Sequence, residues 1–346
     1  MSEFIGTKLT MNLGERSYDI IIKSGSLENL YQFARLDRRV AVVTDSGVPA
    51  QYAQMVADQC RDAHIITVPQ GEASKSFKIL ESVLKQMLEF GMGRGDLVIA
   101  VGGGVVGDLA GFAASIYMRG IDFINCPTTT LSMIDSSIGG KTAVDLGDTK
   151  NIVGAFWQPK LVIVDPDTLS TLPRRHYING LAEAVKASLL ADPELFAIFE
   201  KGDIDAQIGE IICRSLRFKK GIVEQDETEH GMRKALNFGH TIGHGIEAVR
   251  GVRGRRTTGL YHGECVALGM LPMIEDTALL KRTRAIYRAL GLPTRAGANK
   301  EKVLAYMQHD KKARGDHITV IKCPGLGCWR ADSLPMTELP ALLGME

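Results

Sequence analysis

Three histidines in the second half of the chain have the residue types and spacing of a metal site. His240 and His244 are four residues apart, and residues with this spacing lie on one face of a helix. His262 follows them, and Glu183 precedes them. Imidazole and carboxylate groups bind Zn²⁺, and a catalytic zinc keeps one position open beside three protein ligands. The sequence therefore predicts a metal site, and spacing alone favours His240 and His244 as paired ligands, with Glu183 or His262 completing the set.

Charged residues around these histidines leave alternatives open. Glu247 and Glu264 compete with Glu183 as ligands. Glu183 and Lys186 have the spacing of a common helical surface ion pair, but their neighbours are apolar, and a partly buried carboxylate needs a partner such as a metal. Nearby cations either attract a carboxylate or phosphate or form a solvated basic face; they are Lys219, Lys220 and Arg233.

A glycine-rich turn follows an apolar strand in the first half. Gly102 to Asp108 contains G-x-G-x-x-G, a pattern that brings backbone N–H groups against a pyrophosphate at a helix N-terminus. The motif comes late in the chain, and the acidic residue expected about 20 positions on is not clearly placed, although Asp122 is near. Nucleotide binding and a purely structural turn both remain open.

A second glycine segment, Asp135 to Thr142, imitates a phosphate-binding loop. Asp135 stands where that motif has its first glycine, which argues against a nucleoside-triphosphate hydrolase. A glycine turn that carries Lys141 can still bind a phosphate or another anion. Thr128 and Thr129 supply hydroxyls after Pro127, which is also consistent with ordinary loop polarity.

The elements that must position these residues fall into two classes. Continuous apolar strands alternate with helices in the first half, which predicts an α/β domain with a mostly parallel sheet over residues 1–173. Amphipathic helices predominate afterwards, which predicts an all-α domain over residues 174–346. The expected strands are 39–45, 64–68, 96–101 and 161–165, with a short one at 317–322; the expected helices are 51–60, 76–90, 177–190, 208–224, 236–249, 263–283 and 300–308.

Bulk properties exclude several partners. The net charge of +1 and the 6% aromatic content argue against nucleic-acid binding. No apolar run is long enough to span a membrane, and the first ten residues do not form a signal peptide. The six cysteines are scattered, which favours reduced thiols. We expect a cytoplasmic protein without membrane or nucleic-acid partners.

Together these motifs resemble the 3-dehydroquinate synthase family of the sugar-phosphate cyclase superfamily. The resemblance extends from about Asp45 to Lys312. Its ordered elements are Gly71 to Lys75, Gly102 to Asp108, Pro127 to Thr129, Asp135 to Lys141, Lys150-Asn151, Glu183 to Lys186, Arg233 to Glu247, His262 to Glu264 and Asp310 to Lys312.

The resemblance implies a Rossmann-like NAD domain, a helical metal domain and an active site in the cleft between them, in a cytosolic homodimer. It implies the second step of the shikimate pathway, in which 3-deoxy-D-arabino-heptulosonate 7-phosphate cyclises to 3-dehydroquinate and releases phosphate. It also assigns the metal, zinc or else cobalt or another divalent ion, to Glu183, His240 and His262, so that His244 contacts the substrate instead.

The remaining roles also come from the resemblance. The residues it assigns to NAD are Asp45, Glu72, Lys75, Gly102, Gly103, Gly104, Asp108, Thr128, Thr129, Asp135, Lys141 and Lys150. The residues it places around the substrate are Asp135, Lys141, Asn151, Lys186, Lys219, Arg233, Asn237, His244, and Lys311 or Lys312, with Arg119 contributed by the partner chain of a dimer.

Two segments depart from the family pattern. Asp145 to Thr149 differs from the more usual Pro-Leu-Gly, and Arg250 to Leu260 is long, basic and glycine-rich, as in an exposed mobile loop. Three alternative functions remain, because a fold does not determine its substrate. They are another cyclase acting on sedoheptulose 7-phosphate, a metal-dependent alcohol or glycerol dehydrogenase, and a non-enzymatic metal- or nucleotide-binding module.

Overall fold

The computed structural model describes residues 6–147, 149–229, 231–251, 259–308, 313–314 and 316–345. They form two compact units, Met1–Tyr177 (unit 1) and Ile178–Glu346 (unit 2). The division falls within helix α4 (Arg174–Ala191), at whose first residue the sequence placed the domain boundary. No helix among the described residues is both long and apolar enough to cross a membrane.

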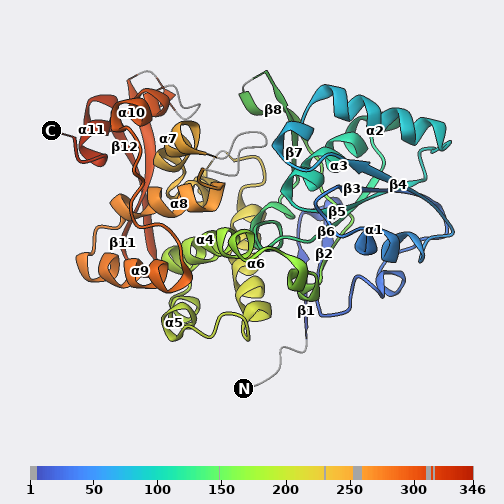
Figure 1. The fold of residues 1–346 in the computed structure, drawn as a ribbon, viewed down its shortest axis with the longest axis horizontal. Coiled ribbons are helices and arrows are strands. Elements are labelled where there is room, and N and C mark those ends of the chain that lie inside the picture. The colour runs from blue at the N-terminus through green and yellow to red at the C-terminus, as the bar shows by residue number, and fades with distance from the viewer. Residues whose placement is uncertain are drawn as a thin grey trace. The chain divides into compact units, whose positions relative to one another are not determined.

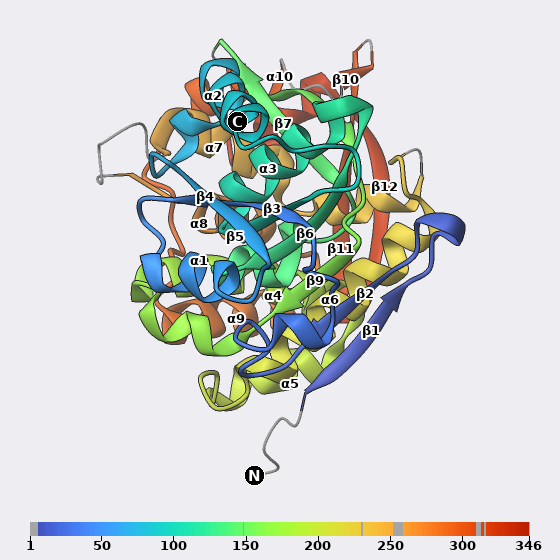
Figure 2. The ribbon, with the colours of Figure 1, turned by 90° about the vertical axis from the view of Figure 1, so that its right-hand side faces the viewer.

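Unit 1 is built on a seven-stranded sheet (Figures 1 and 2). Its edge strand β1 pairs antiparallel with β2, and all other neighbours are parallel. In spatial order the strands are β1 (Thr7–Met11), β2 (Tyr18–Ile22), β9 (Leu161–Val164), β6 (Asp122–Pro127), β5 (Leu97–Gly102), β3 (Arg39–Asp45) and β4 (Asp62–Val68).

Helices cover both faces of this sheet. Helix α1 (Ala50–Ala57) packs on one face, and α2 (Phe77–Glu89) and α3 (Gly104–Ile116) pack on the other. Alternate residues of β3 enter the two cores: Val42 joins the cluster of α1, and Val43 joins that of α2 and α3. Burial on both faces explains why these strands are continuously apolar.

The chain reverses its direction across the sheet between β3 and β5. It proceeds from β3 outward to β4, returns to place β5 on the other side of β3, and continues to β6. The carboxyl ends of β3 and β5, at Asp45 and Gly102, therefore flank a topological switch point, which is where open α/β sheets bind ligands. The predicted glycine turn begins at this point.

Two further elements of unit 1 were not predicted. A π-helix over Ser132–Ser136 carries Asp135, and such turns occur frequently at functional sites. An antiparallel hairpin joins β7 (Lys141–Leu146) to β8 (Thr149–Phe156), with a register shift between Val144 and Leu146.

Unit 2 is mainly helical. Its other helices are α5 (Pro193–Lys201), α6 (Ile208–Gln225), α7 (His240–Arg250), α8 (His262–Met270), α9 (Thr277–Leu290), α10 (Lys300–Gln308) and α11 (Leu339–Leu342). A three-stranded antiparallel sheet accompanies them, formed by β10 (Ala313–Arg314), β11 (His317–Gly325) and β12 (Cys328–Pro335).

The predicted fold class is confirmed, although several elements were not expected, among them β1, β2, β6 and α5. Two further details of unit 2 also differ from the prediction. The sequence predicted only part of β11 in unit 2, whereas the structure adds a complete small sheet. The single helix expected over 263–283 is two helices, because the chain leaves α8 through a 3₁₀ turn that contains Pro272, and Asp276 caps α9.

Candidate functional site

Close packing of two helices in unit 2 positions the histidines. A Cβ atom on Gly243 of α7 would lie 3.1 Å from the backbone of Cys265 and Val266 in α8, and one on Gly269 would overlap the backbone of α7. Only glycine permits so close an approach without displacing a backbone. The glycines of this segment thus let α7, which begins at His240, pack closely against α8, which begins at His262.

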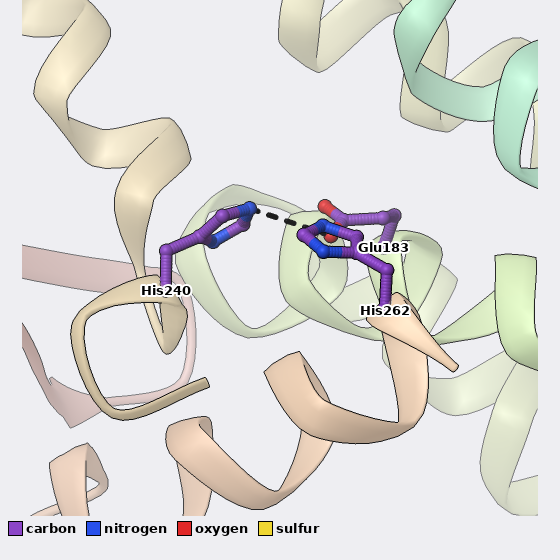
Figure 3. A group of neighbouring side chains, drawn as sticks. All are labelled: Glu183, His240 and His262. Carbon is purple, nitrogen blue, oxygen red and sulfur yellow. Dashed lines mark ion pairs between the residues drawn. The ribbon is translucent and has the colours of Figure 1, made fainter. Parts of the chain in front are cut away.

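Glu183, His240 and His262 converge from α4, α7 and α8 (Figure 3). One ligand atom of each lies within 4.8 Å of those of the other two, close enough for one metal ion. His240 Nε2 is 3.8 Å from a carboxylate oxygen of Glu183, and the two imidazole ring centres are 5.4 Å apart. This is the set that the family resemblance implied.

Glu183 is in an unusual state for a buried carboxylate. Its side chain is 1% exposed, yet neither of its oxygens accepts a hydrogen bond from the described residues. Lys186 Nζ lies in ion-pair contact with it but donates its hydrogen bond to the carbonyl oxygen of Leu236, at 2.9 Å. Burying an anion without hydrogen bonds is costly, so a cation held between Glu183 and the imidazoles would suit this donor set.

Each of the two histidines has a partner on its other ring nitrogen. His240 Nδ1 is 3.1 Å from the carbonyl oxygen of Phe238, and His262 Nδ1 is 2.9 Å from Glu247 Oε2. Burial lowers the pKa of His262, but the hydrogen bond and the negative charge of Glu247 more than offset this, so the pKa is raised. Carboxylate and carbonyl partners of this kind orient metal-binding histidines and select their tautomer.

The two other carboxylates considered as ligands have different surroundings. Glu264 accepts a hydrogen bond from the backbone N–H of Tyr261, at 2.9 Å, and so caps the start of α8; it belongs to neither metal-competent group among the described residues. Glu247 belongs to a second group with His244 and His262, which shares one histidine with the first. His244 is exposed, and its ring centre is 5.3 Å from that of His240.

Buried cations lie in the same unit. Lys186, Lys219 and Arg233 are 3%, 7% and 1% exposed. Lysine and arginine are rarely buried to this degree without partners. The backbone N–H of Arg233 donates to Asp226 Oδ2 at 2.9 Å, and its guanidinium donates to the carbonyl oxygen of Glu227.

Sequence reasoning missed a role for Glu229. This residue has a left-handed backbone with φ of 66°, and its carboxylate accepts a hydrogen bond of 3.1 Å from the side chain of Asn237, a predicted substrate contact. A positive φ in a residue other than glycine is uncommon, but the sequence carries no signal for it. Glu247, which the sequence offered as a competing ligand, contacts His262 in the fold, and no spacing within one helix could have predicted that contact.

The glycine turn of unit 1 has the strand–turn–helix context that its motif requires. Gly102 ends β5, Gly103 precedes α3, and Gly104 is its first residue. A Cβ on Gly103 would lie 3.1 Å from Thr129 Cγ2, and one on Gly104 would lie 3.0 Å from Ser136 Oγ. The first amides of a helix lack intrahelical acceptors, so this turn offers donors to an anion.

Lys75 is at the centre of a polar network beside this turn. Its side chain is 4% exposed, and its Nζ lies 2.6 Å from Asp108 Oδ2 of α3. Nζ also donates to the side-chain oxygen of Asn151 and lies 3.9 Å from Glu72. Lys150 is 4.0 Å from the same Glu72 carboxylate. This one network therefore contains four residues predicted to bind NAD and one, Asn151, predicted to contact the substrate.

The other predicted residues of unit 1 have varied surroundings. Asp45 accepts a hydrogen bond of 2.7 Å from the N–H of Gly47, and burial raises the pKa of its carboxyl group despite the backbone N–H groups that lower it. Lys141 and Arg119 are exposed. Thr128 is buried, and the hydroxyl of Thr129 is 2.8 Å from that of Ser132. Lys311, Lys312 and most of the Arg250 to Leu260 loop lie outside the described residues.

Comparison with known families identifies the chain. The model of the 3-dehydroquinate synthase N-terminal domain matches residues 65–179, and that of the C-terminal domain matches residues 180–313. The chain belongs to the 3-dehydroquinate synthase family. The predicted family and its reaction class, phosphate elimination from a small phosphorylated substrate by a lyase, are thereby confirmed.

Curated relatives agree with this assignment. The 3-dehydroquinate synthase of Streptococcus mutans serotype c is 41% identical over 97% of this chain and 99% of its own length. That of Caulobacter vibrioides is 41% identical over 92% of both chains.

Solved structures support the fold. The 2-epi-5-epi-valiolone synthase of Streptomyces hygroscopicus subsp. jinggangensis 5008, with NAD⁺ and Zn²⁺ bound, superposes with a TM-score of 0.85 at 28% identity, over 96% of this chain and 97% of that one. A glycerol dehydrogenase of Schizosaccharomyces pombe has a TM-score of 0.57 at 17% identity, over 93% of this chain and 86% of that one, and shares the general fold alone.

Proposed function

We propose that this chain converts 3-deoxy-D-arabino-heptulosonate 7-phosphate to 3-dehydroquinate and phosphate, the second step of the shikimate pathway leading to chorismate and the aromatic amino acids. The observation that carries the proposal is the buried Glu183 carboxylate, which accepts no hydrogen bond within the described part of the chain and faces His240 and His262, in a chain about 40% identical to synthases of this name.

Both cofactors fit residues that are present. Glu183, His240 and His262 would hold zinc, cobalt or another divalent ion, as a carboxylate–imidazole set commonly does. The turn at Gly102 to Gly104, with Asp108, Thr128, Thr129 and Lys150, would bind NAD at the switch point of the sheet. The relative solved with NAD⁺ and Zn²⁺ supports this pair of cofactors.

When bound, NAD would supply a reversible acceptor for the hydride on C4 of the substrate, and the metal would polarise the oxygen atoms there. The residues of the chain bind and orient. Lys186, Lys219 and Arg233 provide buried positive charge that would be attracted to the carboxylate and phosphate of the substrate. Asn237 and His244 would donate hydrogen bonds to its hydroxyl groups, and the departing phosphate can accept the C5 proton itself.

The deciding experiment measures phosphate release by the purified protein from 3-deoxy-D-arabino-heptulosonate 7-phosphate, with NAD and zinc, before and after a chelator. Sedoheptulose 7-phosphate is assayed in parallel. Chelator-sensitive release from the first substrate alone, without net NADH, supports the proposal. Release only from the second would assign the chain to a different cyclase reaction. Net NADH without phosphate release would favour a dehydrogenase, and protein that binds NAD and zinc but has no activity would favour a binding module.

We also propose a homodimer in which Arg119 of one subunit contacts the substrate of the other. Arg119 is exposed with φ of 70°, and its neighbours Ile116 and Met118 are exposed apolar residues, at 43% and 41%. Exposed apolar residues beside a strained turn are consistent with an interface.

Mixing two inactive variants tests this arrangement. If Arg119→Ala and Lys186→Met subunits exchange, half of the dimers are mixed and each mixed dimer has one intact site, so activity should return to about a quarter of wild type. No recovery after proven subunit exchange would place Arg119 in its own subunit's site.

We further propose a location in the cytoplasm, because all six cysteines are free thiols in the structure.

A further inference from the structure

We propose that Asp145 is a positioning residue that holds Lys75 and Asn151 in the geometry needed to bind NAD and substrate. The structural part of this inference stands on contacts within unit 1. Its consequence for binding rests on the proposed function. Asp145 begins the segment that departs from the family pattern, and no role was predicted for it.

The first observation is a bulge. The pairing of β7 with β8 shifts register between Val144 and Leu146, where Asp145 alone on β7 lies opposite residues 150–152 of β8, so the extra residues are on β8 and include Asn151. A bulge removes a residue from the ladder and directs its polar groups elsewhere, and bulges are common beside active sites. The backbone N–H of Asp145 accordingly donates to the carbonyl oxygen of Lys75, at 2.8 Å, outside the hairpin.

The second observation is the side chain. Asp145 Oδ1 accepts a hydrogen bond of 2.8 Å from the backbone N–H of Asn151, across the turn of the hairpin. Asn151 has a left-handed backbone with φ of 55°. Asparagine tolerates this conformation better than most residues, but it still costs free energy and persists only where other contacts impose it. The carboxylate of Asp145 supplies such a contact.

The third observation closes a ring. The side-chain oxygen of Asn151 accepts a hydrogen bond from Lys75 Nζ, and the carbonyl oxygen of Lys75 accepts one from Asp145. Asp145, Lys75 and Asn151 are thus each bonded to the other two. Lys75 is also bonded to Asp108, so the ring connects the hairpin to the helix that follows the glycine turn.

The consequence concerns Lys75 and Asn151 rather than Asp145 itself. A lysine side chain has several rotamers, and holding its ammonium group in one place costs conformational entropy. Because Asp145 fixes both the backbone of Lys75 and the backbone of Asn151, it determines where the two side chains meet. Loss of its carboxylate should release Asn151 to an ordinary backbone conformation and move its side chain away from Lys75 Nζ.

The test compares Asp145→Ala with Asp145→Asn, because an asparagine side-chain oxygen can still accept the hydrogen bond from Asn151. Asp96→Ala is the matched control. Asp96 also caps a loop of unit 1, accepting hydrogen bonds of 2.6 Å from the N–H of Gly93 and 3.1 Å from that of Arg39, but belongs to no proposed site.

Three quantities are measured: amide hydrogen exchange of Asn151, NAD affinity by titration calorimetry, and kcat and KM. For Asp145→Ala we expect faster exchange at Asn151 and a loss of about tenfold in NAD affinity or in kcat/KM, the size of one lost hydrogen bond to an ordered group. Asp145→Asn should stay within about threefold of wild type. Asp96→Ala should lower the unfolding temperature without changing NAD affinity or KM.

Two outcomes would overturn the inference. One is unchanged Asn151 exchange and unchanged binding in Asp145→Ala. The other is an Asp145→Asn variant as impaired as Asp145→Ala, which would mean that charge and not the hydrogen bond matters. If wild-type protein neither binds NAD nor releases phosphate, the proposed function fails, while the exchange rate of Asn151 still decides whether Asp145 holds it.

Discussion

The two candidate regions differ in how fully the hydrogen-bonding capacity of their buried charges is satisfied. In unit 1, Lys75 is bonded to Asp108, Asn151 and Asp145 of β7, and the carboxylate of Asp108 neutralises its charge inside the protein. In unit 2, the buried carboxylate of Glu183 forms an ion pair with Lys186, but it accepts no hydrogen bond from the described residues and faces two imidazoles. The first region is organised before any ligand binds, whereas the second has a donor set whose electrostatics improve when a cation is added.

The largest expected effect comes from removing the metal-facing charge. Glu183→Gln preserves the size of the side chain but removes an anionic ligand. We expect turnover to fall by about 10³-fold, since a catalytic metal contributes several kcal/mol. Metal content by elemental analysis should fall with it, and NAD affinity should stay unchanged because the glycine turn lies in unit 1.

Glu200→Gln is the matched control for this change. It removes the same charge from unit 2, where Glu200 forms a surface pair with Arg282 at 2.7 Å. This variant should keep its metal and its activity, because exposed pairs contribute little. Full metal occupancy and turnover in Glu183→Gln would contradict the assignment of Glu183 as a ligand.

A smaller effect should follow from Glu247→Gln, which keeps a side-chain oxygen near His262 but removes the carboxylate charge. Removing a carboxylate that orients a metal-binding histidine typically lowers metal affinity or activity by about 10- to 100-fold. Competition with a chromophoric chelator measures the affinity without any assay of turnover. A wild-type metal affinity would show that Glu247 does not orient His262.

The opposite region is probed by Asp108→Asn, which weakens the contact of 2.6 Å with Lys75. We expect about a tenfold loss of NAD affinity, the size of one weakened charge-assisted hydrogen bond, together with a lower unfolding temperature. Metal content should be unchanged. Loss of metal in this variant would show that metal binding in unit 2 depends on the Lys75 network of unit 1.

The smallest expected effect concerns cysteine reactivity, which reports whether unit 1 stays folded in the variants described above. Burial raises the pKa of Cys60 in unit 1 to about 11, whereas Cys328 of β12 is exposed. Only the thiolate reacts with a maleimide, so at pH 8 Cys328 should label first. Because the thiolate fraction of Cys60 rises with pH below its pKa, its labelling should accelerate by roughly tenfold per pH unit.

The same labelling pattern in the Glu183→Gln and Asp108→Asn proteins would show that both remain folded. Rapid labelling of Cys60 at pH 8 in either one would indicate that unit 1 has opened, and would remove that variant from the comparison.

Some of this molecule follows from short stretches of sequence. The apolar run 39–45 is β3, the pattern of 300–308 is α10, and the turn at Gly102 lies between a strand and a helix. Strand β6 was missed because it carries Asn125 and ends at Pro127, both of which are weak strand formers.

The spacing of His240, His244 and Glu247 along α7 was also readable from the sequence, because helical periodicity is a local property. Motif order then identified the family, which the comparisons confirmed.

Tertiary structure alone decided which neighbours these residues have. Glu183 and His262 are far apart in sequence and meet because Gly263 lets α8 pack closely against the backbone of Asn179 in α4. Glu264 was a possible ligand by composition, and in the fold it caps α8. The ring of Asp145, Lys75 and Asn151 depends on a bulge and a positive φ. A segment's own pattern encodes which of its faces is apolar, whereas the partner of a buried charge is set by packing between segments.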